Sequence, residues 1–333
     1  MARRRRIRWD RVFITAALFI GLIILLGSCA QKCSGRSSKE ESSTGSPLEP
    51  LGSDSSRAGS AESTGINSGG SGDEPAQTQT APAALPADYT RKTVTANEMY
   101  KGSLVLVNDD NPNHLSREEL DLQQIYYASD RPDCYVLSYP AYTFLNRTAL
   151  TRFNAMMKAY YAATSNEEIM FNYGYLETGK EKSNPESSSG LNIQLHLKLV
   201  NGSYDFISNT GKYAWIFEHM DSYGYILRYP ADKSDITGVR HAHPYSAIRY
   251  VGTPHAAYIK QNNLCLEEYL DLLKNQYTFG QGMLDFAVNE LQYRIYYVPA
   301  SRTGDTEVPV PIKESFDISG NNVDGFIVTV QMN

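Results

Sequence analysis

Apolar and polar residues alternate strictly over positions 191–200, where Leu or Ile occupies every second position from Leu191 to Leu199. Successive side chains of a strand point to opposite faces of its sheet, so this pattern predicts a strand with one buried face. Over positions 150–161, large apolar residues instead recur three and four positions apart, which predicts an amphipathic helix. The two patterns together indicate a core built from both kinds of element.

Shorter patterns extend this mixture along the chain. Further strands are predicted at 103–108, 170–175 and 225–229, and further helices at 213–220, 254–261 and 266–273. After Tyr277 the chain changes to strand-like runs separated by Gly, Pro and Asn, at 291–298, 315–318 and 326–330. Strands and helices without regular alternation are typical of an α+β fold. We therefore expect an α+β domain over 89–274 and a small β extension over 275–333.

The first 30 residues have the pattern of a membrane-targeting segment. Six Arg precede an uncharged, mostly apolar run at 12–26, and such an arrangement predicts insertion with the Arg side in the cytoplasm. The run through Ala30 is just long enough for a transmembrane anchor of roughly 20 residues. Alternatively, Leu26-Gly27-Ser28-Cys29 resembles a bacterial lipobox, in which Cys29 is lipidated after cleavage of a signal peptide. Both alternatives predict a chain held at the cell membrane, with its folded part on the extracellular side of a bacterium.

Residues 31–88 have the composition of a linker. They include thirteen Ser and eight Gly but no aromatic residue, whereas all 24 Tyr of the chain follow residue 88. A segment with so little apolar surface cannot offset the conformational entropy lost on folding. We therefore predict a disordered Ser/Gly-rich linker that ends near Tyr89.

Charge and cysteine content narrow the functional classes. Residues 89–333 hold 21 basic and 28 acidic side chains, a net charge of −7, and this balance argues against nucleic acid as a partner. Four Cys in 333 residues exclude a disulfide-rich scaffold. Within the predicted fold, Cys134 and Cys265 are either one disulfide or two free buried thiols, and spacing alone does not decide between them.

Three groups of segments, in order along the chain, carry a resemblance to a known family. They are Leu104-Val105-Leu106-Val107-Asn108-Asp109-Asp110-Asn111-Pro112, Glu186-Ser187-Ser188-Ser189-Gly190-Leu191-Asn192-Ile193-Gln194, and Tyr223-Gly224-Tyr225-Ile226-Leu227-Arg228-Tyr229-Pro230 with Arg249-Tyr250-Val251-Gly252. These segments resemble the vancomycin-resistance type D-alanyl-D-alanine carboxypeptidases of the LAS metallopeptidase group. The resemblance implies a hedgehog/D,D-peptidase-like fold, with a small antiparallel sheet and flanking helices. It also implies zinc peptidase ancestry and the stem peptide of peptidoglycan as the ligand.

The resemblance does not extend to the zinc ligands. The three ligand positions of the family are occupied here by Ser187, Gln194 and Ser246, and the general-base position is occupied by His243. Neutral hydroxyl and amide oxygens are poor zinc ligands beside imidazole and carboxylate. We therefore expect no cofactor, and a pseudoenzyme that binds stem peptide or regulates a wall enzyme. Tyr245 and Arg249 are the residues expected to line its cleft.

Two other functions remain open from the sequence. His196, His241 and His243 could form a relocated zinc site, because His196 follows Gln194 by two positions on one strand face and the other two are also two apart. An active metal-dependent D,D-carboxypeptidase would then be retained. The plain alternative is that these are exposed or hydrogen-bonded histidines. In the third function, the cleft is filled and the chain is a structural or interaction protein of the cell envelope that uses 275–333.

Overall fold

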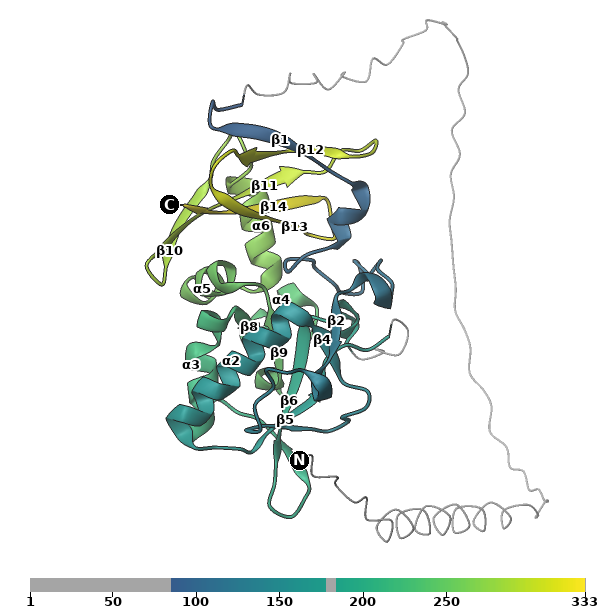
Figure 1. Ribbon diagram of the computed structural model, residues 1–333, viewed down its shortest axis with the longest axis vertical. Coiled ribbons are helices and arrows are strands. Elements are labelled where there is room, and N and C mark those ends of the chain that lie inside the picture. Colours follow the sequence, from purple (N-terminus) through teal and green to yellow (C-terminus); the bar gives the residue numbers. More distant parts are fainter. Residues whose placement is uncertain (1–84, 178–183, 333) are drawn as a thin grey trace, which may run out of the picture. The chain divides into compact units, whose positions relative to one another are not determined.

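The computed structural model describes residues 85–177 and 184–332 (Figure 1). The predicted anchor with Cys29 and nearly all of the predicted linker fall outside these ranges. Within the described ranges, no helix has both the length and the apolar character that crossing a membrane requires.

A mixed sheet forms the centre of the first part of the fold. Its strand order is β3-β5-β6-β9-β8, with β7 paired to β6, and all pairs are antiparallel except β3 with β5. The strands are β3 (Val136–Leu137), β5 (Ile169–Tyr173), β6 (Asn192–Lys198), β7 (Tyr204–Phe206), β8 (Tyr225–Leu227) and β9 (Ala247–Tyr250). The expected α+β character is therefore confirmed at the level of mixed helix and sheet.

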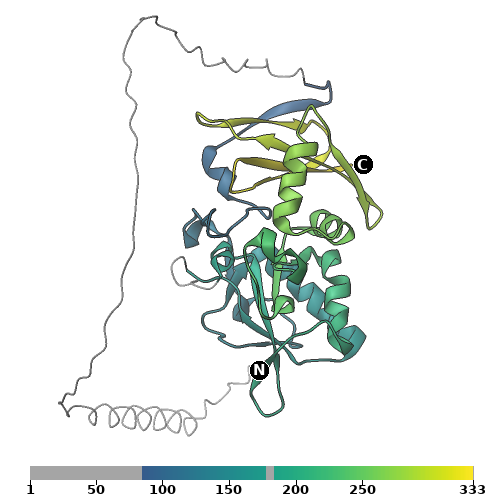
Figure 2. The same ribbon diagram turned by 180° about the vertical axis from the view of Figure 1, so that it is seen from behind.

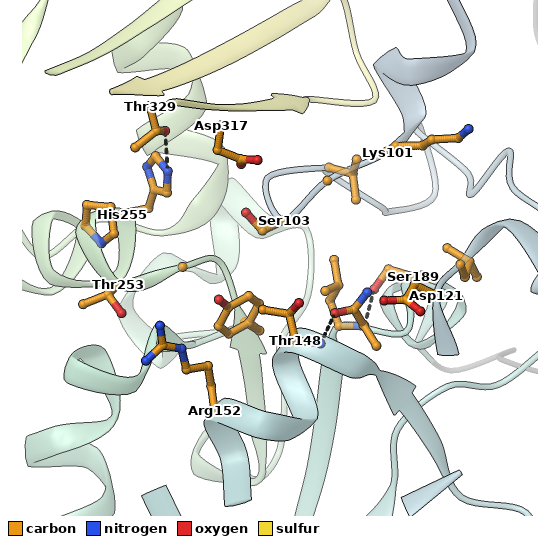
Figure 3. A pocket seen from close by; sticks show the side chains of 18 of the residues that line it. Lys101, Ser103, Asp121, Thr148, Arg152, Ser189, Thr253, His255, Asp317 and Thr329 are labelled. Atoms are coloured by element: carbon orange, nitrogen blue, oxygen red, sulfur yellow. Dashed lines mark hydrogen bonds between the residues drawn. The ribbon is translucent and has the colours of Figure 1, made fainter. Parts of the chain in front are cut away.

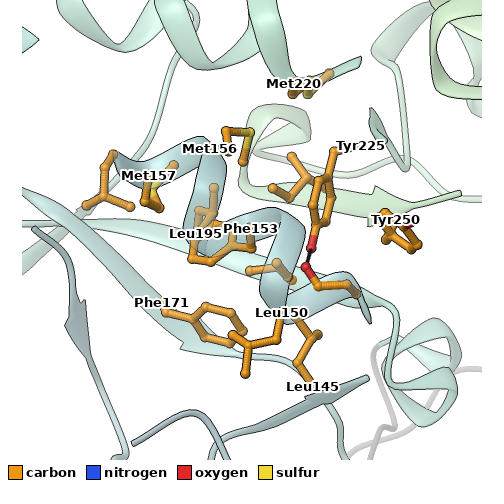
Figure 4. Packing of buried hydrophobic residues seen from close by; sticks show 14 of the residues in the cluster. Leu145, Leu150, Phe153, Met156, Met157, Phe171, Leu195, Met220, Tyr225 and Tyr250 are labelled. Carbon is orange, nitrogen blue, oxygen red and sulfur yellow. Dashed lines mark hydrogen bonds between the residues drawn. The ribbon is translucent and has the colours of Figure 1, made fainter. Parts of the chain in front are cut away.

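Helix α2 (Arg147–Thr164) covers one face of this sheet, as Figure 4 shows. The side chain of Asn146 accepts hydrogen bonds from the amides of Thr148 and Ala149, which starts the helix. Phe153 is fully buried, as are Met156, Met157 and Tyr160. The helix predicted from the apolar spacing at 150–161 is thus confirmed, and it is three residues longer at each end.

Both faces of strand β6 are buried, whereas the alternation predicted only one buried face. Ile193 and Leu195 pack beneath α2 as expected, but Asn192, Gln194 and His196 on the other face are also buried, with 0%, 5% and 7% exposure. The 3₁₀ turn Pro185–Ser189 and the turn Pro244–Ser246 both pack against β6. The polar half of the alternation therefore marks a buried polar face, which a solvent-facing strand would not have.

A second, four-stranded antiparallel sheet lies in the C-terminal part of the chain. Its order is β10 (Leu284–Val288), β11 (Leu291–Pro299), β14 (Gly325–Met332) and β13 (Ser315–Gly320). Helix α6 (Leu266–Gln276) packs on one face, as seen from behind in Figure 2. The antiparallel pair of β1 (Tyr89–Val94) and β12 (Thr306–Pro311) packs on the other. The strands expected from 291, 315 and 326 are confirmed, whereas β1, β10 and β12 were not predicted.

The strand expected at 103–108 is wrong. This segment is irregular, although Leu104 and Val107 in it are buried. The guanidinium of Arg249 donates to the carbonyl oxygens of Ser103 and Val105, both at 2.9 Å, so a buried arginine satisfies these carbonyls in place of a neighbouring strand.

The remaining elements connect and flank the two sheets. The other helices are α3 (Ala214–His219), α4 (Ser234–Thr237) and α5 (Thr253–Gln261), and β2 (Leu122–Gln124) pairs with β4 (Phe144–Asn146). Short 3₁₀ helices lie at Ala96–Tyr100, Arg117–Glu119, Ile125–Tyr127, Gly211–Tyr213, Met220–Tyr223 and Ala231–Lys233. Cys134 and Cys265 are free, buried thiols, and burial raises the pKa of Cys265 to about 12.

Candidate functional site

The sheet brings the three ligand positions into one neighbourhood. Gln194 pairs with Ala247 across β6 and β9, so Ser246 comes one residue before this pair. Ser187 lies in the 3₁₀ turn that packs on β6, and its carbonyl accepts a hydrogen bond from the amide of Leu176, just after β5. The register of three neighbouring elements therefore gathers Ser187, Gln194 and Ser246 on the buried polar face of β6.

These three side chains are buried, and each has a polar atom without a hydrogen-bonding partner among the described residues. Ser187 and Ser246 have 0% exposure and Gln194 has 5%. The hydroxyls of both serines and the Oε1 atom of Gln194 have no partner within the described part of the chain, and neither do the side-chain amide of Asn192 nor Nδ1 of His196. Each such group costs about 1–3 kcal/mol unless it is satisfied, so this face favours occupation by a polar partner.

The donor set does not fit a zinc ion. Zinc sites in proteins use thiolate, imidazole and carboxylate ligands, and the three positions here offer only neutral oxygens. Over residues 85–177 and 184–332, no three His, Cys, Asp or Glu side chains are grouped closely enough to hold a metal ion. No catalytic step through zinc is therefore derived for this chain.

The histidines of the predicted relocated site do lie in one region, but their rings pack against aromatic residues. The ring of His196 stacks on Tyr204 at 4.8 Å between centroids. Phe206 lies 5.0 Å from His196 on an edge and stacks on His243 at 3.4 Å, so the Phe206 ring contacts both imidazoles. Nδ1 of His241 accepts the amide hydrogen of His243 at 3.1 Å, which occupies one of its two nitrogens.

Burial and a neighbouring imidazole lower the pKa of His196 and of His241, which keeps these two rings neutral over a wider pH range. Burial lowers the pKa of His196, and the nearby His243 lowers it further. The same two causes lower the pKa of His241. His196 and His243 thus form an aromatic cluster with Tyr204 and Phe206, whereas the ring of His241 stacks on Tyr229 at 5.9 Å between centroids.

A buried ion-pair network supports the same face, and the sequence patterns did not single it out. Glu186 accepts from Arg228 at 2.8 Å and also from Arg249, and all three side chains have 0% exposure. Arg228 also pairs with Glu267 at 2.8 Å. Burial lowers the pKa of Arg228, but the carboxylates of Glu186 and Glu267 more than offset this and raise it. The sequence contained one sign of this network, because Arg228 is a charged residue inside the apolar run at 225–229.

The two residues predicted to line the cleft have different environments. Arg249 is fully buried in the network with Glu186, so it contacts the interior and does not face open solvent. Tyr245 is half-buried against Phe217, 4.9 Å away, and lines a cavity of about 420 Å³. The cavity is walled mainly by apolar residues, among them Met220 and Ile226.

Comparison with known proteins agrees with the resemblance seen in the segments. No model of a known protein family matches the chain. A D-alanyl-D-alanine carboxypeptidase of Enterococcus faecium is 33% identical over 248 residues, which are 72% of this chain and 78% of that protein. The chain belongs to the D-alanyl-D-alanine carboxypeptidase family. A family member of Enterococcus faecalis strain ATCC 700802 / V583 is 46% identical over 72 residues, 21% of this chain and 26% of its own length.

A solved structure extends the family relationship to most of the described fold. The vancomycin-resistance D,D-dipeptidase VanXYg, in complex with a D-Ala-D-Ala phosphinate analogue, superposes with a TM-score of 0.60 at 25% identity. The match covers 73% of this chain and 99% of VanXYg. Family membership is thereby shown, whereas the hedgehog-type description of the sheet stays a prediction.

Proposed function

We propose that this chain is a D-alanyl-D-alanine carboxypeptidase family member without zinc peptidase activity, which binds the stem peptide of peptidoglycan. The observation that carries the proposal is the presence of neutral side chains at Ser187, Gln194 and Ser246 within a family fold. Amide hydrolysis at a metal site needs an activated water and a charge that stabilises the oxyanion. These three side chains supply neither, and the ring of His243 is stacked on Phe206.

The orphaned polar atoms support a peptide as the partner of this face. The serine hydroxyls both donate and accept, the Oε1 atom of Gln194 accepts, and the Asn192 amide does both. A peptide backbone offers matching N–H and C=O groups at regular spacing. Half-buried Tyr173, which pairs with Gln194 across β5 and β6, is an aromatic side chain beside this face that would contact such a ligand. VanXYg, the structural relative, was solved with a D-Ala-D-Ala analogue.

We expect binding without turnover. The full chain should bind a stem pentapeptide ending in D-Ala-D-Ala, measured by titration calorimetry, and release no D-alanine when zinc is added. Gln194→Leu should weaken binding about 5-fold or more, because it removes an unpartnered acceptor while keeping side-chain volume. The matched control, Gln281→Leu, changes an exposed glutamine in a turn and should leave the affinity unchanged.

Two outcomes would replace this proposal. Zinc-dependent release of D-alanine would establish an active D,D-carboxypeptidase, and His196, His241 and His243 would then be substituted to find its metal ligands. Absence of both binding and release would leave a structural or interaction protein of the cell envelope that uses 275–333.

We also propose that the folded part is held outside a bacterial cell by the N-terminal segment. The Arg-rich flank and the apolar run at 12–26 support this location. If Cys29 is lipidated, Cys29→Ala should abolish incorporation of a labelled fatty acid, whereas Cys33→Ala, the neighbouring control, should not. Membrane retention without any labelling of the unaltered chain would contradict the lipid anchor and favour a transmembrane helix.

A further inference from the structure

Figure 3 shows a second cavity, which has a volume of about 600 Å³. Its lining comes from residues 100–105, from the N-terminal turns of α2 and α5, and from the neighbouring strands β13 and β14. None of its lining residues is Ser187, Gln194 or Ser246. Small-molecule sites in proteins typically measure about 300–1,000 Å³ and often lie between two parts of a fold, so this cavity has the size of a ligand site.

One side of the cavity is cationic and rich in hydrogen-bond donors. Arg152 extends from α2 toward Thr253, the first residue of α5 (Figure 3). No carboxylate in the described part of the chain lies within ion-pair distance of Arg152. Burial raises the pKa of the neighbouring Tyr250 hydroxyl, and the guanidinium of Arg152 lowers it. Helix α5 has no side-chain cap among the described residues, and although Pro254 lacks an amide hydrogen, the helix dipole adds positive potential at this point.

The opposite side presents a carboxylate. Asp317 is exposed on β13, opposite Thr329 of β14, and it points into the cavity (Figure 3). Within the described residues, no Lys or Arg lies within ion-pair distance of Asp317. The other two acidic residues of the lining are already engaged, since Asp121 pairs with Arg147 and Glu119 accepts from the amide of Ser116.

The alternation of β13 and β14 explains why this carboxylate faces the cavity. Ser315, Asp317 and Ser319 occupy one face of β13, while Phe316 and Ile318 on the other face pack in the core with β1 and β12. On β14, Thr329 and Gln331 share the face of Asp317. The sheet thus presents a polar face to the cavity, and core packing on the opposite face fixes its register.

We propose that this cavity binds a small zwitterion, an amino acid or short peptide with a free carboxylate and a free ammonium group. The carboxylate pairs with Arg152 at the start of α5, and the ammonium pairs with Asp317. The coexistence of unpaired charges of both signs in one ligand-sized space carries this inference. A phosphate-type dianion would be repelled by Asp317, and a plain cation would be repelled by Arg152. The proposal does not depend on stem-peptide binding at the polar face of β6.

The test is titration calorimetry of the full chain with two dipeptides, L-Ala-L-Ala and D-Ala-D-Ala, and with their N-acetyl and C-amide derivatives. At least one free dipeptide should bind saturably, and both of its capped derivatives should bind about 10-fold more weakly or worse, since each loses one charge-assisted contact. Arg152→Gln should abolish the preference for the free acid over the amide. Asp317→Asn should abolish the preference for the free amine over the acetyl derivative.

Control variants separate this site from the polar face of β6. Arg302→Gln and Asp285→Asn remove exposed charges that do not line the cavity, and they should leave dipeptide affinity unchanged. Gln194→Leu should also leave it unchanged, whereas it should weaken stem-pentapeptide binding. The proposal is overturned if neither dipeptide binds saturably when its concentration is raised to about 10 mM. Binding that Gln194→Leu abolishes and Arg152→Gln does not would equally overturn it, and would assign the dipeptide to the other face.

Discussion

Restoring imidazole and carboxylate at the three ligand positions is expected to raise the zinc affinity of this chain by about 1,000-fold or more. The variant carries Ser187→His, Gln194→Asp and Ser246→His, which supply the His₂-carboxylate set of a catalytic zinc site. Loss of single groups that only orient ligands already costs about 10–100-fold in metal affinity, so three direct ligands should have a larger combined effect. Chelator competition at neutral pH measures the affinity, and a rise in the thermal midpoint with added zinc checks it independently.

The control for this variant has the same three residue changes at exposed positions. Ser203→His, Ser208→His and Gln281→Asp add identical side chains where no site is expected. An equal gain in both variants would reflect nonspecific binding. No gain in the first variant would mean that Ser187, Gln194 and Ser246 do not converge as the register of β6 and β9 indicates.

Glu186→Gln should destabilise the fold by about 3–5 kcal/mol. This change keeps the side-chain shape but removes the negative charge between Arg228 and Arg249, both with 0% exposed side chains. Arg228 keeps its pair with Glu267, whereas the acceptors that Arg249 retains within 85–177 and 184–332 are carbonyl and hydroxyl oxygens. A fully buried guanidinium without a counterion is costly, and Arg does not lose its proton in proteins. Urea unfolding followed by circular dichroism measures the loss.

The comparison for Glu186 is an ion pair on the surface. Asp285→Asn breaks the pair with Arg294, where the Asp285 side chain is 59% exposed, and it should cost only about 0–1 kcal/mol. Equal, small losses in the two variants would contradict the role of Glu186 as the counterion of a buried arginine pair.

Local patterns predicted the elements whose packing depends on near neighbours. The spacing of Phe153 and Met156 was sufficient for α2, because a helix satisfies its own backbone and needs only one apolar face. The strand expected at 103–108 was wrong because the partner of its carbonyls is Arg249, well over a hundred positions away. The same is true of Arg249 as a cleft residue, since Glu186 is 63 positions away. No local window contains such partners.

The candidate site was predictable only in part for a similar reason. The resemblance to the family pointed to Ser187, Gln194 and Ser246, and the sheet register gathers them. The relocated histidine site was inferred from two-residue spacing, which correctly put His196 in the region of His243. Spacing gave no sign of Phe206, which reaches both rings because β7 folds back on β6. The polar positions of β6 looked exposed because burial by a turn leaves no periodic signal in the strand itself.

The pairing of β1 with β12 sets an order of events during biosynthesis. Thr93 hydrogen-bonds to Glu307, 214 positions later, and the core under this pair also needs β11 and β14. A chain emerging from the ribosome, or crossing a membrane from its N-terminal end, therefore presents β1 long before its partner exists. Until the last strands arrive, Tyr89 and Val94 have no core to enter and must be kept from other strands. The final sixty or so residues are thus needed before β1 can fold. A nascent chain that stops short of them leaves β1 unpaired, as a substrate for chaperones or proteases.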